Sequence, residues 1–95
     1  MTLDHVTVRG ERHYVIDGRL DLRQKEITDI KKIEGLELLI NLQELVLSGN
    51  QIKEIKGLDK LTNLRKLDLD GNQIREIKGL ENRINLQYVS RTIIQ

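Results

Sequence analysis

Two histidines and two serines are the side chains of this chain that come closest to catalytic or metal-binding chemistry. His5 and His13 are of the type that binds transition metals, but no third ligand lies near them in the sequence, as a protein metal site requires. Ser48 and Ser90 have no histidine–acid partner in register, and no glycine-rich phosphate-binding motif is present. We interpret both histidines as ordinary structural residues, and we predict that the chain is not an enzyme and uses no cofactor.

Three aspartates share one predicted strand surface, where they could form a calcium site. Calcium is bound by several oxygen ligands that converge on one point. In the predicted sheet Asp21 lies two strands away from Asp68, with Val46 between them, so their carboxylates do not converge. We interpret Asp21, Asp68 and Asp70 as solvated carboxylates and predict no metal site.

The elements that position these residues are set by an internal repeat. Residues 41–62 read NLQELVLSGNQIKEIKGLDKLT and residues 63–84 read NLRKLDLDGNQIREIKGLENRI, with 13 of 22 positions identical. Self-similarity at such a period is typical of proteins built from stacked units.

Each unit contains two hydrophobic periodicities. Leu45 and Leu47 alternate with Glu44, Val46 and Ser48, and Leu67 and Leu69 alternate in the same way one unit later. This period of two predicts a strand with one buried face. Apolar residues at intervals of three then predict a 3₁₀-like or extended return path that faces inward every third residue; they are Ile52, Ile55, Leu58 and Leu61.

A polar corner separates the strand from the return path. Ser48-Gly49-Asn50 and Asp70-Gly71-Asn72 are turn sequences at the same place in the two units. We expect Asn50 and Asn72 to point inward and form a structural ladder, because the backbone groups of adjacent coils would otherwise be buried without hydrogen-bond partners.

The spacing L-x-x-L-x-L-x-x-N-x-I-x-x-I-x-G-L resembles the leucine-rich repeat in its short 22-residue subclass, which includes bacterial internalins, a protein-phosphatase regulatory subunit and a spliceosomal A′ protein. The resemblance covers about residues 19 to 91. It implies an α/β fold: a right-handed leucine-rich-repeat solenoid with a parallel β-sheet on the concave face and a 3₁₀, short helical or extended convex side. It also implies that the protein binds something, without naming a partner.

The first eighteen residues do not fit the repeat and predict a different structure. Turns at Gly10-Glu11 and Asp17-Gly18 would give an antiparallel β-meander whose third strand is also the first strand of the repeat sheet. This meander would cover the first coil as a cap. In that register three valines face the core with Leu20 and Leu22, namely Val6, Val8 and Val15, and three residues face away, namely Thr7, Tyr14 and Ile16.

We therefore divide a single domain, residues 1–95, into five parts. They are a β cap (1–18), an irregular repeat (19–40), two regular repeats (41–62 and 63–84) and a partial repeat (85–95). Three extra residues fall within 23–32, because Leu20 to Leu45 spans 25 residues and Leu45 to Leu67 spans 22. One or two helical turns are expected between Ile30 and Leu39.

The C-terminal end departs from the repeat, and two interpretations stay open. Arg83 and Arg91 occupy positions that are leucine in the preceding unit. Either residues 92–95 fold back as a minimal cap, or the last coil contacts another molecule and forms a homodimer.

The outward strand positions form two rows across the predicted sheet. One row contains Ile16, Arg19, Glu44, Lys66 and Tyr88, and the other contains Tyr14, Asp21, Val46, Asp68 and Ser90. The charged residues either pair across neighbouring strands or bind a partner. The apolar bulk of Tyr14, Ile16, Val46 and Tyr88 favours binding, since tyrosine is a common interface anchor.

The charge balance excludes several partners. Lys and Arg number 16 against 15 Asp and Glu, a formal net charge of +1, which gives no footprint for nucleic acid or an anionic membrane. Cysteine is absent, and no apolar run suggests a signal peptide or a membrane span. We expect a cytoplasmic, non-catalytic protein–protein interaction module that binds its partner through the concave face. The alternative is a structural unit that self-associates through its C-terminal coil.

Overall fold

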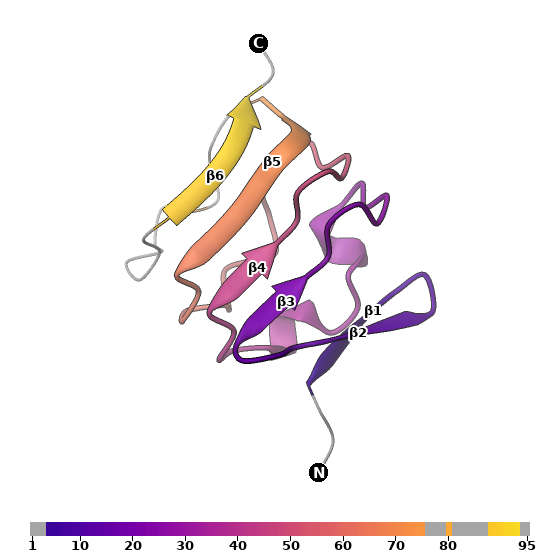
Figure 1. The fold of residues 1–95 in the computed structure, drawn as a ribbon, viewed down its shortest axis with the longest axis vertical. Coiled ribbons are helices and arrows are strands. Elements are labelled where there is room, and N and C mark those ends of the chain that lie inside the picture. Colours follow the sequence, from indigo (N-terminus) through magenta and orange to yellow (C-terminus); the bar gives the residue numbers. More distant parts are fainter. Residues whose placement is uncertain (1–3, 76–79, 81–87, 94–95) are drawn as a thin grey trace.

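The computed structural model describes residues 4–75, 80 and 88–93. Within these residues the strands form two sheets, a two-stranded hairpin (β1 and β2) and a four-stranded parallel sheet in the order β3-β4-β5-β6 (Figure 1). Two short 3₁₀ helices, η1 and η2, follow β3. The bounds are β1 His5–Val8, β2 Glu11–Tyr14, β3 Arg19–Asp21, η1 Ile30–Lys32, η2 Leu36–Leu38, β4 Glu44–Val46, β5 Lys66–Ile74 and β6 Tyr88–Ile93.

The parallel sheet confirms the predicted repeat. Leu20 pairs with Leu45, and Leu45 pairs with Leu67, so equivalent residues of successive coils lie side by side. All three leucines are fully buried, because each strand turns one face toward the coil interior. The coils therefore stack in register with the period read from the sequence.

The return paths also follow the predicted period of three. In the second coil the residues at that interval are buried, and no helix is assigned across 51–65. In the first coil η1 and η2 provide the expected helical turns. Gly35 separates them with a φ of 91°, and Asp29 caps η1 by accepting a hydrogen bond from the Lys31 N–H.

Among the described residues, the core consists of leucine, isoleucine and valine, with two buried polar exceptions, Asn50 and Asn72. Asn50 Oδ1 accepts from the N–H groups of Lys25 and Ile27, both at 3.0 Å. Asn50 Nδ2 donates to Leu22 O at 3.0 Å and to Leu47 O at 2.8 Å. Each amide side chain thus joins its own coil to the coil before it.

Asn72 makes the equivalent bonds one coil later. It accepts from the Ile52 N–H at 3.0 Å and donates to Leu47 O and Leu69 O at 2.9 and 3.0 Å. The two asparagines together form the inward-pointing ladder that the sequence analysis expects, and Leu47 O takes part in both steps.

The N-terminal segment differs from the predicted meander. The first turn is at Arg9-Gly10, with φ values of 52° and 79°, and not at Gly10-Glu11. A type I′ turn needs positive φ at both central residues and favours glycine at the second, which this placement provides. Asp17-Gly18 forms the expected second turn, with φ values of 52° and 76°.

The predicted three-stranded meander is also wrong. Ile16 and Arg19 exchange backbone hydrogen bonds as an isolated bridge, and β2 does not pair with β3 as a strand. The free edge of β1 instead bonds to the return path: Thr7 and Glu34 exchange two hydrogen bonds of 2.9 Å. The hairpin therefore lies beside the first coil, at the end of the stack away from β6 (Figure 1).

The predicted faces of this hairpin are nevertheless correct. Val6 and Val8 are buried, and Val15 packs against the core, while Tyr14 and Ile16 are exposed. Moving the first turn by one residue shifts the pairing partners on β2 by two residues. Side chains alternate between faces with a period of two, so each residue stays on its predicted face.

The irregular part of the first repeat holds the hairpin in place. Arg9 donates from Nη1 to Glu26 Oε2 at 2.7 Å and from Nη2 to the Glu26 carbonyl at 2.9 Å. Glu26 lies within the 23–32 segment that carries the three extra residues, and its φ is 57°. The extra residues thus place a corner of the first coil within reach of the hairpin turn.

The C-terminal strands are longer than predicted. β5 continues through the Asp70-Gly71-Asn72 corner to Ile74, with a register shift against β6 between Leu69 and Ile74. Val89 and Leu80 pack against the core. The predicted roles of Arg83 and Leu86 fall outside the described residues.

We predict that Asn50→Ala destabilises the fold by roughly 1–3 kcal/mol, because the substitution leaves buried backbone N–H and C=O groups of two coils unpaired. Chemical denaturation of the variant measures this loss. Gln51→Ala is the control, since the Gln51 side chain is exposed. Equal and negligible losses in both variants would contradict the ladder.

We also predict that Gly71→Ala is more destabilising than Gly10→Ala. Both glycines have positive φ, 70° and 79°, so both variants share a left-handed backbone cost of about 1–2 kcal/mol. A Cβ at Gly71 would lie 3.3 Å from the Gly49 backbone N, whereas a Cβ at Gly10 has nothing within 4 Å. Denaturation midpoints compare the two, and equal losses would show that the stacked corners tolerate the extra carbon.

Candidate interaction surface

The backbone register of the parallel sheet aligns residues from four separate parts of the chain. Arg19, Glu44 and Lys66 are paired in register, and Tyr88 follows on β6. The neighbouring row aligns Asp21, Val46, Asp68 and Ser90. The register of both rows across β3 to β6 is therefore the predicted one.

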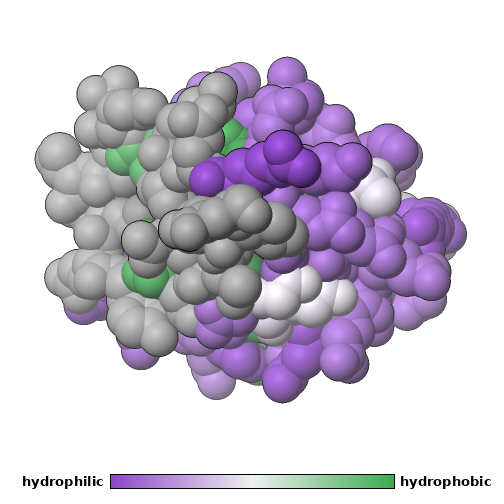
Figure 2. Space-filling view, turned by 90° about the horizontal axis from the view of Figure 1, so that it is seen from above, coloured by the Kyte–Doolittle hydropathy of each residue, from purple (hydrophilic) through white to green (hydrophobic). Residues whose placement is uncertain are grey.

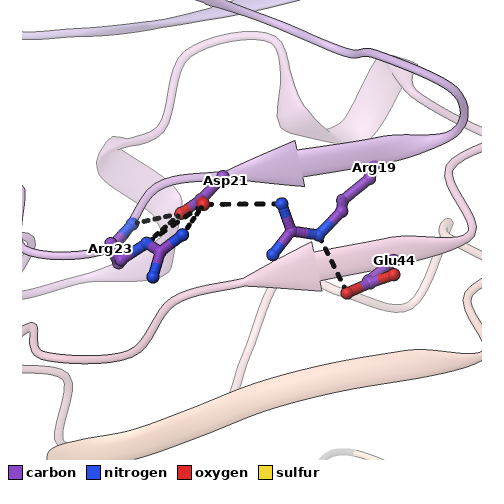
Figure 3. Close-up of polar contacts among 4 residues, drawn as sticks. All are labelled: Arg19, Asp21, Arg23 and Glu44. Atoms are coloured by element: carbon purple, nitrogen blue, oxygen red, sulfur yellow. Dashed lines mark hydrogen bonds and ion pairs between the residues drawn. The ribbon is translucent and has the colours of Figure 1, made fainter.

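Four charged residues form one connected network: Arg19 and Asp21 on β3, Arg23 just after β3, and Glu44 on β4 (Figure 3). Arg19 Nε donates to Glu44 Oε2 at 3.0 Å, and Arg19 Nη1 lies 3.5 Å from Asp21 Oδ2. Arg23 donates to both carboxylate oxygens of Asp21, with the shortest distance 2.7 Å from Nη2 to Oδ2. The network satisfies its own charges without a partner.

The network lowers the pKa of Asp21 from its ordinary value of 3.8. Partial burial on its own would raise this pKa, because it disfavours the ionised carboxylate. Hydrogen bonds from the Arg23 side chain and backbone, with the charges of Arg23 and Arg19, outweigh the burial. Asp21 therefore stays ionised and held by Arg23 at neutral pH.

Val46 does not have the exposed position that was expected. Only 4% of its surface is accessible, although it stands in the outward row between Asp21 and Asp68. Val46 is nevertheless absent from the core cluster formed by the other buried hydrophobic residues.

The β4–β5 part of the surface is less self-contained. A hollow of about 310 Å³ is lined by Glu44, Lys66, Leu67 and Asp68. Asp68 Oδ1 accepts from the Asp70 N–H at 3.1 Å, and Lys66 is exposed with no ion pair among the described residues. The charge of Lys66 is therefore more available to another molecule than the charges of the Arg19–Arg23 network, which are already paired.

The two predicted tyrosine anchors lie in different sheets. Tyr14 belongs to the hairpin, where its ring centroid lies 5.7 Å from that of His5, and it is not part of the four-stranded sheet. Ile16 is 68% exposed and bonded to Arg19 through its backbone. The backbone of Tyr88 is paired with Lys66, as predicted.

The histidines lie in the hairpin. His13 is half-buried, with its Nε2 atom 3.7 Å from Glu11 Oε1. In the described part of the chain, no three His, Cys, Asp or Glu side chains are grouped so that they could hold a metal ion. No helix in that part is long and apolar enough to cross a membrane.

A second asparagine contact between coils was not predicted from the sequence. Asn63 Nδ2 donates to Ile40 O at 3.1 Å and lies 3.4 Å from Asn41 Oδ1. The signal was present, because asparagine opens both 22-residue units. This contact joins successive coils on the outside, just before β4 and β5.

Comparisons with known proteins gave a family match and a structural match. Residues 40–82 match the family model described as leucine-rich repeats, in two copies. The structure is similar to the crystal structure of an internalin (inlF) from Listeria monocytogenes, with 25% sequence identity and a TM-score of 0.41 over 79% of this chain. The match covers 34% of that internalin chain. No curated protein matches the sequence.

We predict that Asp21 makes folding stability depend on acid pH. Because its pKa is lowered in the folded state, its contribution is present above the ordinary aspartate pKa and is lost as pH falls through the folded value. The difference in unfolding free energy between wild type and Asp21→Asn should be less than about 1 kcal/mol at neutral pH and shrink on acidification. Denaturant titrations across the acid range measure it, and a difference independent of pH would contradict the assignment.

Proposed function

Because this chain is a leucine-rich repeat protein, with repeats in residues 40–82, we propose that it is a non-catalytic module that binds another protein. The partner contacts the outer face of the β3–β6 sheet. This face is the concave side of a right-handed solenoid, and the β1–β2 hairpin is its N-terminal cap. Repeat proteins commonly bind through such extended sheet surfaces.

The hollow on the β4–β5 face carries the proposal. Its lining combines Lys66 with Asp68, so a partner meets both signs of charge within one depression; Glu44, which also lines it, is already bonded to Arg19. Lys66 has no ion pair among the described residues, so binding a carboxylate there breaks no existing salt bridge. Specific charge pairs of this kind mainly govern partner choice and association rate.

The Arg19–Asp21–Arg23–Glu44 network has a different part in this proposal. Its members already satisfy one another, and a partner that displaced these bonds would lose them before gaining new ones. We assign these four residues to the polar rim of the interface. Tyr14, Ile16 and Tyr88 are the proposed apolar contacts of the interface. A cytoplasmic location remains a prediction from the sequence.

A second candidate function is self-association through the C-terminal coil. β6 pairs with β5 along one edge, and no other strand among the described residues pairs with it. An open edge of this length, six residues, is a template for pairing with another chain.

We predict that Tyr14→Ala and Tyr88→Ala each weaken partner binding by about 2 kcal/mol or more, as expected for interface anchors. The partner is first isolated by affinity purification with mass spectrometry from the source cell, and the affinities are then measured by titration calorimetry. Lys66→Ala should also weaken binding. Lys53→Ala, an exposed position on the return path, should leave the affinity nearly unchanged. A partner that responds to Lys53 and Lys56 but ignores both tyrosines would place the interface on the return-path face.

A further inference from the structure

Lys66 has carboxylates on two sides, yet among the described residues it forms an ion pair with neither. The sheet register places Glu44 directly beside Lys66 on the adjoining strand, and Asp68 follows two residues later on the same strand. All three side chains line one hollow. Opposite charges side by side on neighbouring strands stabilise a sheet when they pair, so the missing pair at Lys66 requires a physical cause.

Both carboxylates beside Lys66 are engaged elsewhere. Arg19, on the other side of β4, donates from Nε to Glu44 Oε2 at 3.0 Å. Asp68 Oδ1 accepts from the Asp70 N–H at 3.1 Å. Glu44 thus lies between two cations, Arg19 and Lys66, and is bonded only to the first. The direction in which Glu44 points therefore determines how much free charge Lys66 presents.

The geometry of the network explains why Glu44 is bonded to Arg19. A guanidinium group is planar and can bond two carboxylates at once, whereas an ammonium group is a point charge on a flexible stem. Arg19 Nε bonds Glu44, and Arg19 Nη1 lies 3.5 Å from Asp21 Oδ2. Asp21 is fixed in turn by Arg23, whose Nη2 donates to Oδ2 at 2.7 Å. The Arg19 guanidinium is therefore held between Asp21 and Glu44 as an oriented donor (Figure 3).

We propose that Arg19 is a positioning residue that holds Glu44 away from Lys66 and so keeps Lys66 free for an acidic side chain of the partner protein. This inference rests on the proposed function and adds to it the residue that controls the binding group. Without Arg19, Asp21 would keep its hydrogen bonds from Arg23. The Glu44 carboxylate, in contrast, has no other hydrogen bond or ion pair among the described residues, and its remaining neighbouring cation is Lys66.

The control of Lys66 matters because of the kind of surface that this molecule presents. The described surface in Figure 2, seen from above, is mainly hydrophilic. On a hydrophilic surface the charges that remain unpaired contribute strongly to partner choice and association rate. Lys66 is such a charge only while Arg19 holds Glu44, since a pair between Glu44 and Lys66 would compete with the carboxylate of the partner.

Amine labelling of the free protein tests the positioning role without a partner. N-acetoxysuccinimide acetylates an unpaired lysine faster than one held in an ion pair, and peptide mass spectrometry measures each lysine separately. In wild type, Lys66 should react within about threefold of Lys53, an exposed lysine of the return path. Arg19→Gln should slow the labelling of Lys66 by about two- to fivefold, the range expected for an exposed ion pair, and leave Lys53 unchanged.

Two further variants separate the pairing of Glu44 from the loss of a positive charge. Arg12→Gln removes one positive charge from an exposed position on β2, outside the network, and should leave the labelling of Lys66 unchanged. Glu44→Gln combined with Arg19→Gln removes the competing carboxylate, so Lys66 should again react at the wild-type rate. Circular dichroism melts check that every variant is folded.

Three results would overturn the proposal. They are a Lys66 rate that Arg19→Gln does not change, a slowing that Glu44→Gln does not reverse, and a faster Lys66 in Glu44→Gln alone. The last would mean that Glu44 already pairs with Lys66 in wild type. Once the partner is isolated, Arg19→Gln should weaken its binding by a similar factor. The expected labelling together with a partner that ignores Lys66→Ala would refute the proposed interface and still support the positioning role.

Discussion

The polar corner of each coil is the constraint on which the rest of this structure depends. A chain that leaves a strand and turns into the core carries backbone N–H and C=O groups with it, and these cannot remain unpaired away from water. Asn50 and Asn72 solve the problem with one amide each, which accepts from one stretch of backbone and donates to two carbonyls. Since some of these partners belong to the preceding coil, pairing the corner also fixes how far one coil stands from the next.

That fixed stacking determines what the outer surface can display. Once the corners are aligned, residues 22 positions apart lie side by side on the sheet, and the surface pattern follows from the sequence. The Arg19–Glu44 pair and the Lys66–Asp68 hollow are both consequences of register. The same logic makes Leu38 and Ile40 conspicuous, because their successors in the next coil are polar.

The repeat and its sheet could be predicted because every level of the sequence agreed on them. Leucines at period two, apolar residues at period three and the asparagine corners recur together, so the register followed directly. The hairpin turn lies one residue earlier than predicted because Arg9 adopts a positive φ, which is uncommon for residues other than glycine. The docking of β1 on Glu34 is a long-range contact with no local signal, and in place of the meander the chain forms only an isolated Ile16–Arg19 bridge before β3. Val46 was expected to be exposed because of its strand face alone, whereas only 4% of its surface is accessible in the fold.

The attachment of the hairpin also has a consequence for how such a chain can vary in length. Two contacts join the hairpin to the first coil, namely Arg9–Glu26 and Thr7–Glu34, and neither reaches the second coil. Asn72, in turn, needs only the coil immediately before it. A duplication of residues 41–62 would therefore add one strand to the middle of the sheet while leaving both ends with their existing neighbours. Recombination can lengthen or shorten this molecule in whole coils, whereas the first coil and its hairpin must be inherited together.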